Sequence, residues 1–293
     1  MFMDMSYIKM LRPTNWVKNF AVVLPLFFAM KAGDIISCVN ILEAALIFCL
    51  LSSFVYIIND INDQKSDIYH PYKKDRPIAS GRVSIANAVV VAAGLLFAAF
   101  LWAYLYVPQI IALGAGYIAL QMAYTFGLKR IVLLDVICIA LGFVIRAAAG
   151  AVAIDVAISP WLFICMFTVC LFMGFCKRYN ERATFDADSA AAMHRDTLLE
   201  YTPQLLTHLV TLSAGIAVIS FISYAMNPLT IAQFGSEKLV YTLPVVVYAV
   251  FRFAMISMKA IYEGPTEIIL QDRPFQISVA VWFVWLFAVI NLF

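Results

Sequence analysis

An apolar run over residues 40 to 59 ends in Asn59-Asp60-Ile61-Asn62-Asp63-Gln64-Lys65-Ser66-Asp67, where three carboxylates are spaced three and four residues apart. If this stretch is helical, about 3.6 residues per turn place Asn59, Asp63 and Asp67 on one stripe, with Asp60 beside Asp63. Carboxylates packed this closely repel one another unless a cation lies among them. Hard oxygen ligands that leave room for substrate phosphates are typical of magnesium. The spacing therefore predicts a magnesium site, whereas the alternative is a solvated loop that avoids the bilayer.

A basic segment follows the acidic one. It reads His70-Pro71-Tyr72-Lys73-Lys74-Asp75-Arg76-Pro77 and supplies three cations and a histidine. Cationic side chains beside a magnesium site are suited to bind the phosphates of a substrate. We therefore expect Lys73, Lys74 and Arg76 to bind substrate phosphate groups.

The composition is that of a membrane protein. Of the 293 residues, 64% are hydrophobic and only 13% are charged, far from the roughly half-apolar average of soluble domains. Runs of about 20 apolar residues can each cross the bilayer, and the absence of alternating hydrophobicity indicates helices. We expect an all-α integral membrane protein that forms a single domain over 1–293, with nine transmembrane helices at residues 16 to 36, 40 to 59, 84 to 106, 108 to 127, 131 to 153, 158 to 177, 204 to 226, 238 to 260 and 275 to 293.

The distribution of charge predicts the orientation in the membrane. Most of the 20 basic residues fall on one side of the nine predicted spans. The positive-inside rule then places the N-terminus and the loops at 59 to 83, 177 to 203 and 261 to 274 in the cytoplasm, and the C-terminus outside. Because these loops also carry most of the ionisable side chains, we expect an active-site cavity that faces the cytoplasm. The lipid bilayer is the expected partner, and no nucleic acid is expected.

A second cluster of charge begins the loop after residue 176. It reads Lys177-Arg178-Tyr179-Asn180-Glu181-Arg182, and the loop continues to Tyr201. In a helix, Lys177 and Glu181 lie one turn apart and form an ion pair, while Arg178 and Arg182 form a cationic strip. One interpretation is a helix end anchored at lipid headgroups, and the other is phosphate binding. With the acidic motif in the same chain, we take Lys177, Arg178, Glu181 and Tyr201 as substrate-binding candidates.

Arg146, Lys18 and Asn19, which lie within predicted spans, are three further candidates. Arg146 lies 11 residues after Asp135, close to three helical turns, so both would lie on one face. Intramembrane arginine usually points into a bundle or a water-filled cavity. Arg146 would either steer an anionic substrate or pair with a buried acid. Lys18 and Asn19, just inside the first predicted span, are carried as substrate-binding candidates.

Together these residues resemble the UbiA superfamily of intramembrane prenyltransferases. The motif Asn-Asp-x-x-Asp-x-x-x-Asp after the second predicted helix is typical of the superfamily. The basic segment and the Lys-Arg-x-x-Glu motif are similar to its branch of polyprenyl-phosphate phosphoribosyltransferases, often called decaprenyl-phosphate phosphoribosyltransferases. The resemblance spans the whole chain and is carried by Arg12 to Asn19, Asn59 to Gly81, Asp135 to Gly150, Ser159 to Trp161, Lys177 to Glu181, Pro265 to Glu267 and Asp272 to Pro274.

One departure from ordinary prenyltransferases bears on the substrate. Those enzymes have a second Asp-x-x-x-Asp that grips a prenyl diphosphate with a second magnesium. In this chain no two aspartates of the second loop have that spacing. Asp186 and Asp188 are only two residues apart, and Lys177-Arg178 with Glu181 stand there instead. Phosphoribosyl pyrophosphate carries an additional phosphate, and a lipid phosphate acceptor is also anionic. Both substrates favour added cations over a second acidic pair.

The resemblance implies a Mg²⁺-dependent enzyme of the bacterial cytoplasmic membrane. Such an enzyme transfers the 5-phosphoribosyl group from phosphoribosyl pyrophosphate to a polyprenyl phosphate and releases pyrophosphate, for cell-envelope glycan precursors. Asp60, Asp63 and Asp67 would be the catalytic residues that hold magnesium on the pyrophosphate, positioned by Asn59. Lys73, Lys74 and Arg76 would clamp the donor. Lys177, Arg178 and Arg146 would orient the 5-phosphate or the acceptor phosphate.

Two other functions compete with this one. A prenyltransferase acting on an aromatic acceptor would need the second acidic pair that the sequence lacks. A transporter of ions or lipids would place its carboxylates near the middle of the bilayer, whereas these acids lie at the predicted cytoplasmic edge. The sequence leaves open the chain length of the lipid and whether the protein forms a homo-oligomer.

Overall fold

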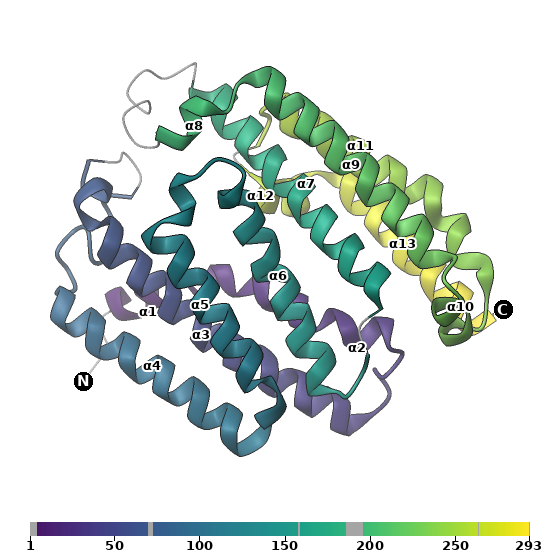
Figure 1. The fold of residues 1–293 in the computed structure, drawn as a ribbon, viewed down its shortest axis with the longest axis horizontal. Helices are drawn as coiled ribbons and strands as arrows, with labels where there is room; N and C mark the ends of the chain where they lie inside the picture. The colour runs from purple at the N-terminus through teal and green to yellow at the C-terminus, as the bar shows by residue number, and fades with distance from the viewer. Residues whose placement is uncertain (1–4, 70–72, 158, 186–195, 263, 293) are drawn as a thin grey trace. The chain divides into compact units, whose positions relative to one another are not determined.

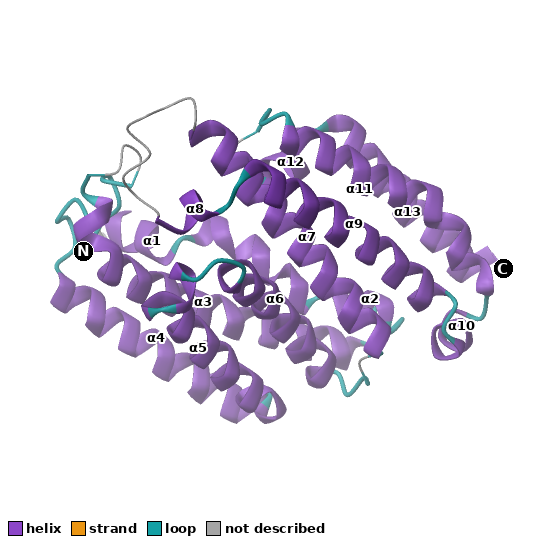
Figure 2. Ribbon diagram, turned by 45° about the horizontal axis from the view of Figure 1, so that its top comes forward, coloured by secondary structure: helices purple, strands orange, loops and turns teal. Residues whose placement is uncertain are grey.

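The computed structural model describes residues 5–69, 73–157, 159–185, 196–262 and 264–292. Within these ranges every regular element is a helix and there is no strand (Figure 2). The all-α prediction is therefore confirmed for the part of the chain that is described. The chain divides into two compact units, Met1–Ala157 and Ile158–Phe293. That the two act as a single domain stays a prediction.

The first unit is built around one long helix (Figure 1). Its elements are α1 (Met5–Leu11), the 3₁₀ helix η1 (Pro13–Val22), α2 (Leu24–Phe28), α3 (Ile35–Asp67), α4 (Ile85–Tyr106), the 3₁₀ helix η2 (Pro108–Ile110), α5 (Ile111–Phe126), the 3₁₀ helix η3 (Leu128–Arg130) and α6 (Leu134–Ala153). Asp34 caps α3 by accepting hydrogen bonds from the amides of Ile36 and Ser37. At about 1.5 Å per residue, α3 is about 50 Å long and exceeds a hydrocarbon core of about 30 Å. The helix is therefore longer than the hydrocarbon core is thick.

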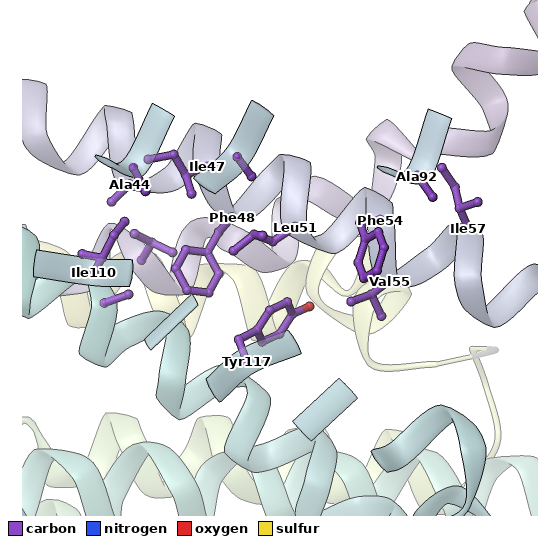
Figure 3. Packing of buried hydrophobic residues seen from close by; sticks show 14 of the residues in the cluster. Ala44, Ile47, Phe48, Leu51, Phe54, Val55, Ile57, Ala92, Ile110 and Tyr117 are labelled. Atoms are coloured by element: carbon purple, nitrogen blue, oxygen red, sulfur yellow. The ribbon is translucent and has the colours of Figure 1, made fainter. Parts of the chain in front are cut away.

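The core of the first unit forms where α3 packs on α4, α5 and α6. Phe48 and Leu51 of α3 are fully buried, and the ring of Phe48 lies 5.4 Å from that of Tyr117 on α5. Figure 3 shows the rings of Phe48 and Tyr117 among the buried side chains of this core. On α4, alanines including Ala92 and Ala99 face α3, and such small residues allow close approach of helices in a membrane. This core fixes the face of α3 along which the polar side chains lie.

The segment predicted as the first span is not one straight helix. The structure has η1 followed by the five-residue α2, and Met30 then adopts a left-handed backbone with φ of 55°. Pro13 and Pro25 each stand near the start of a helix, where their missing N–H is tolerated, and each interrupts a continuous α-helical ladder. η1 packs directly on α6: a Cβ at Gly150 would lie 1.9 Å from the carbonyl oxygen of Val22. Only glycine permits this contact.

The second unit is a bundle of longer helices joined by short ones. Its elements are α7 (Pro160–Phe185), α8 (Asp196–Glu200), α9 (Pro203–Ala225), α10 (Pro228–Phe234), the 3₁₀ helix η5 (Glu237–Thr242), α11 (Leu243–Met258), α12 (Pro265–Gln271) and α13 (Arg273–Leu292). α7 packs along α9. The ring of Phe253 on α11 lies 5.6 Å from that of Phe172 on α7 and 5.7 Å from that of Phe275 on α13, so aromatic contacts link three helices.

Seven helical segments in the described ranges are long and apolar enough to cross a membrane. They are Ile35–Asp67, Ile85–Tyr106, Pro108–Phe126, Leu134–Ala153, Pro160–Ala183, Pro203–Ala225 and Glu237–Met258. These correspond to seven of the nine predicted spans. The predicted first span is divided between η1 and α2, and the last is the shorter apolar stretch Arg273–Ala288 of α13.

Candidate active site

The predicted acidic stripe forms on the last turns of α3. The helix runs without a break to Asp67, so Asn59, Asp63 and Asp67 follow one another at one-turn intervals, as the spacing predicts. Asp60 and Asp67 are both buried, with 3% of each residue exposed. Nη1 of Arg76 lies between them, 3.1 Å from Oδ1 of Asp60 and 2.6 Å from Oδ2 of Asp67. One guanidinium nitrogen thus bridges two carboxylates two helical turns apart.

A second arginine reaches Asp60 from the N-terminal segment. Arg12, between α1 and η1, has a left-handed backbone with φ of 52° and forms an ion pair with Oδ1 of Asp60. Its guanidinium lies 5.3 Å from the ring centroid of Tyr56, one turn before Asp60 on α3. Nζ of Lys18 lies 6.0 Å from the same ring. The candidate Lys18 is therefore held beside α3 by a cation–π contact.

A lysine accompanies the remaining carboxylate. Nζ of Lys129, in η3, lies 2.6 Å from Oδ1 of Asp63 and 3.3 Å from Oδ1 of Asn59. Nδ2 of Asn59 donates to Oδ2 of Asp63 at 3.0 Å. Asn59 therefore helps to orient Asp63.

Sequence reasoning missed Arg12 and Lys129. Both lie at ends of predicted spans on the side of the acidic motif. Their position on the same predicted side of the membrane as the acidic motif was the one hint in the sequence that they could belong to the site. Only the tertiary structure shows which acid each of them contacts.

The other basic candidates after α3 differ in their surroundings. Arg76 is brought directly to the acids, whereas Lys73 is half-buried and Lys74 is exposed. Residues 70 to 72, including the histidine at 70, lie outside the described residues. Among the predicted phosphate-binding residues of this loop, Arg76 is the one that the structure places at the carboxylates.

Arg146 and Asn19 meet in the interior of the first unit. Nε of Arg146 donates to Oδ1 of Asn19 at 2.8 Å, Nη1 to the carbonyl of Gly142 at 2.9 Å and Nη2 to the hydroxyl of Tyr117 at 2.7 Å. Asn19 also exchanges hydrogen bonds with Ser52 of α3. Within the described part of the chain, no carboxylate forms an ion pair with Arg146. Of the two roles that the sequence allowed, pairing with a buried acid is therefore absent there.

The second charged cluster lies at the end of α7. Nζ of Lys177 is 3.6 Å from Oε1 of Glu181, which confirms the predicted one-turn ion pair. Arg178 also pairs with Glu181 and is buried, so it does not stand with Arg182 in a separate cationic strip. Tyr201 is fully buried. Residues 186 to 195, including Asp186 and Asp188, lie outside the described residues.

Comparison with known proteins shows the family of the chain. The model of the UbiA prenyltransferase family matches residues 20–267. The chain belongs to this family. Decaprenyl-phosphate phosphoribosyltransferase of Mycolicibacterium smegmatis is 35% identical over 94% of the chain and 89% of its own length, and that of Mycobacterium tuberculosis is 32% identical over 94% and 91%. A UbiA homologue from Archaeoglobus fulgidus, solved with DMAPP and Mg²⁺, has a TM-score of 0.70 at 18% identity, covering 98% of this chain and 100% of that one.

Membership of the UbiA family agrees with the apolar helices, and the protein is an integral membrane protein. The structural likeness to the archaeal homologue shows a shared fold. The predictions of an all-helical bundle and of this superfamily are thus confirmed.

The donor atoms of this UbiA-family chain suit magnesium in their chemistry. In the described residues no group of three or more His, Cys, Asp or Glu side chains converges closely enough to hold a metal. However, magnesium is commonly bound by one or two carboxylates together with substrate phosphates. Asp60 and Asp67 already converge on one positively charged atom, that of Arg76. These two oxygens therefore fit a cation, whose place the guanidinium takes.

Proposed function

We propose that this protein transfers the 5-phosphoribosyl group of phosphoribosyl pyrophosphate to a polyprenyl phosphate and releases pyrophosphate. The observation that carries the proposal is the surplus of cations beside α3. Arg12, Arg76 and Lys129 contact the acids directly, and Lys18 lies beside Tyr56, one turn before Asp60 on α3. These cations can bind the phosphate groups of a donor that carries both a pyrophosphate and a phosphate. The names of the similar mycobacterial proteins support the same substrates.

The carboxylates and the cations have complementary roles in this proposal. Asp60, Asp63 and Asp67, with Asn59, would hold Mg²⁺, which supplies charge stabilisation to the departing pyrophosphate. Arg12, Arg76 and Lys129 neutralise the carboxylates without substrate and turn toward the donor phosphates when these bind. Lys73 and Lys74 extend the positive charge along the loop. The cations thus bind and orient the donor, and the acids set where its pyrophosphate lies.

The acceptor needs no general base because a phosphate is already an anionic nucleophile. Its oxygen attacks C1 of the ribose, the bond from C1 to the pyrophosphate oxygen breaks, and pyrophosphate leaves with the bonding electrons. In-line attack inverts C1 and gives a β-linked product. The protein contributes orientation and the exclusion of water, which would otherwise attack C1. Lys177 and Arg178, oriented by Glu181, and Tyr201 remain our candidates for substrate binding in the second unit.

We also propose nine membrane crossings. A 3₁₀ helix rises about 2.0 Å per residue, so η1 and α2 together extend about 30 Å and match the hydrocarbon core despite their break. α13 would be the ninth crossing. An odd number of crossings and the positive-inside rule place the N-terminus and the acidic end of α3 in the cytoplasm and the C-terminus outside. The bilayer would be that of a bacterial cytoplasmic membrane, and the site would open to the cytoplasm.

The choice of donor tests the proposal. Purified protein with Mg²⁺ is incubated with a polyprenyl phosphate and phosphoribosyl pyrophosphate, and in parallel with an aromatic acid and a prenyl diphosphate. We expect a phosphoribosylated lipid in the first mixture and no prenylated product in the second. Prenyl transfer without phosphoribosyl transfer would overturn the proposal and favour an aromatic prenyltransferase.

A further inference from the structure

Arg146 is a buried cation whose charge no carboxylate balances within the described residues. Only 5% of the residue is exposed, and its three hydrogen-bond acceptors are all neutral: Asn19, Gly142 and Tyr117. The ring of Tyr117 lies 4.6 Å from its guanidinium carbon, which adds a cation–π contact. A charge withdrawn from water without an opposite charge is costly, and in membrane proteins such residues mark functional sites. The arrangement therefore calls for an anion supplied from elsewhere.

The surroundings of Arg146 are rich in hydrogen-bond donors. A guanidinium has five N–H groups, and the described hydrogen bonds use three of them. Gly142, one turn before Arg146 on α6, leaves room for polar groups from two helices. A Cβ at this position would lie 2.8 Å from Nε2 of Gln121 and 3.5 Å from Nη1 of Arg146. Glycine here lets the side-chain amide of Gln121 and the guanidinium of Arg146 lie close to the backbone of α6.

Arg146 and Gln121 lie nearer the N-terminal part of α3 than the acidic stripe does. Asn19 links Arg146 to Ser52, and Ser52 precedes Asp60 on α3 by two turns, or about 12 Å along the axis. Tyr56, which carries Arg12 and Lys18 against its ring, lies between the two levels. Positive groups therefore occur at both levels, whereas among the described residues the carboxylates that contact them lie at the level of Asp60.

The distance of Arg146 from the acidic end of α3 bears on which substrate it would bind, the donor or the lipid phosphate. Lys129 of η3 contacts Asp63, so η3, which precedes α6 in the chain, lies at the acidic end of α3. Arg146 lies about 18 Å along α6 from Leu134. The phosphate of a membrane lipid stays at the level of the headgroups, near the end of a span. A sugar with one anionic group at each end extends from that level inward.

We infer that Arg146, Tyr117 and Gln121 bind the 5-phosphate of the donor, while the acidic end of α3 receives its pyrophosphate. This inference rests on the proposed function and deepens it, because it assigns the two ends of the donor to two levels of the first unit. Asn19 is then a positioning residue, which holds the guanidinium of Arg146 through Oδ1. The site would favour a ribose that carries the 5-phosphate over one that lacks it.

Binding of two ligands tests the inference. The affinities of phosphoribosyl pyrophosphate and of inorganic pyrophosphate, each with Mg²⁺, are measured by calorimetry on the whole protein in detergent. Arg146→Gln should weaken the binding of phosphoribosyl pyrophosphate roughly tenfold to a hundredfold, the usual effect of losing a charge-assisted contact. It should leave the affinity for pyrophosphate unchanged. Arg273→Gln, which removes an exposed arginine of the second unit, is the matched control and should change neither affinity.

Variants that retain Arg146 keep the test decisive if Arg146→Gln does not fold. Tyr117→Phe removes one hydroxyl, and Gly142→Ala places a methyl group against Gln121 and Arg146. Each should weaken the binding of phosphoribosyl pyrophosphate and leave the binding of inorganic pyrophosphate unchanged. An equal loss of affinity for both ligands, or no loss of affinity for either, would overturn the inference. So would a rise confined to the KM for polyprenyl phosphate, which would assign the site to the lipid.

The proposed function fails in a different way. If the wild-type protein forms no phosphoribosylated lipid, the proposed function and the inference built on it are both wrong. If it forms that product and the Arg146, Tyr117 and Gly142 variants bind phosphoribosyl pyrophosphate like the wild type, the inference alone is wrong.

Discussion

Nη1 of Arg76 lies 2.6 Å from Oδ2 of Asp67, so this ion pair puts a cation at the carboxylate that we propose as a Mg²⁺ ligand. The same nitrogen contacts Asp60, so the two buried carboxylates share one positive charge. A divalent metal that binds these oxygens must displace the guanidinium. Displacement is easier when a donor phosphate can receive Arg76. We therefore expect metal and donor to bind this protein cooperatively.

Replacing Arg76 should strengthen the binding of metal alone. Arg76→Gln leaves Asp60 and Asp67 without their shared cation, so the affinity for Mn²⁺ in the absence of donor should rise several-fold, measured by electron paramagnetic resonance. Turnover of phosphoribosyl pyrophosphate should fall at least tenfold because a charge-assisted phosphate contact is lost. Arg82→Gln, an exposed arginine of the same loop, is the control. Unchanged or weaker binding of Mn²⁺ in Arg76→Gln would contradict this account.

Lys129 should matter for the donor although sequence reasoning did not select it. Lys129→Met removes the cation that contacts Asp63 and Asn59. We expect kcat/KM for phosphoribosyl pyrophosphate to fall roughly tenfold to a hundredfold, as for loss of a charge-assisted contact. Steady-state kinetics with varied donor measure the effect, and Arg130→Gln, the exposed neighbour, is the matched control. Equal kinetics for Lys129→Met and the wild type would remove Lys129 from the site.

Gly150 should be required for the packing of η1 on α6. In Gly150→Ala the new methyl group would overlap the carbonyl oxygen of Val22, so backbone must move. Overpacking of this kind typically costs about 1 to 3 kcal/mol, and the midpoint of thermal unfolding in detergent should fall by several degrees. Gly94→Ala is the control, because nothing lies within 4 Å of a Cβ there. A Gly150→Ala variant as stable as Gly94→Ala would show that η1 does not lie against α6.

The ion pair between Arg252 and Asp272 should stabilise the second unit in a pH-dependent way. Hydrogen bonds from Arg252 hold the pKa of Asp272 below its usual value of 3.8, and Asp272 also accepts from the amide of Phe275 at the start of α13. A lowered pKa in the folded state means that the stabilisation is complete above pH 3.8 and is lost as the pH falls through the folded pKa.

Asp272→Asn should accordingly lower the thermal midpoint at pH 7, by an amount that corresponds to about 1 to 3 kcal/mol. The difference from the wild type should shrink as the pH is lowered below about 4. Thermal unfolding across pH 3 to 7 measures it. A difference that grows toward low pH would contradict the assigned sign.

Local patterns predicted what depends on one helix. The spacing from Asn59 to Asp67 required only that α3 continue, and the ion pair of Lys177 with Glu181 required only one turn of α7. Contacts between distant segments were not predictable in this way. Arg12 meets Asp60 across 48 positions and Lys129 meets Asp63 across 66, and no periodicity encodes such pairs. Nor did apolarity reveal that the segment after Pro13 would form a 3₁₀ helix.

The central claim concerns which bond of the donor breaks, and isotopic labelling tests it most directly. Purified protein is given a polyprenyl phosphate and phosphoribosyl pyrophosphate that carries ³²P either in the 5-phosphate or in the terminal phosphate of the pyrophosphate. The account predicts that the 5-label enters the lipid fraction while the terminal label appears as inorganic pyrophosphate. Terminal label in the lipid, or 5-label that stays in the aqueous fraction as free ribose phosphate, would contradict it.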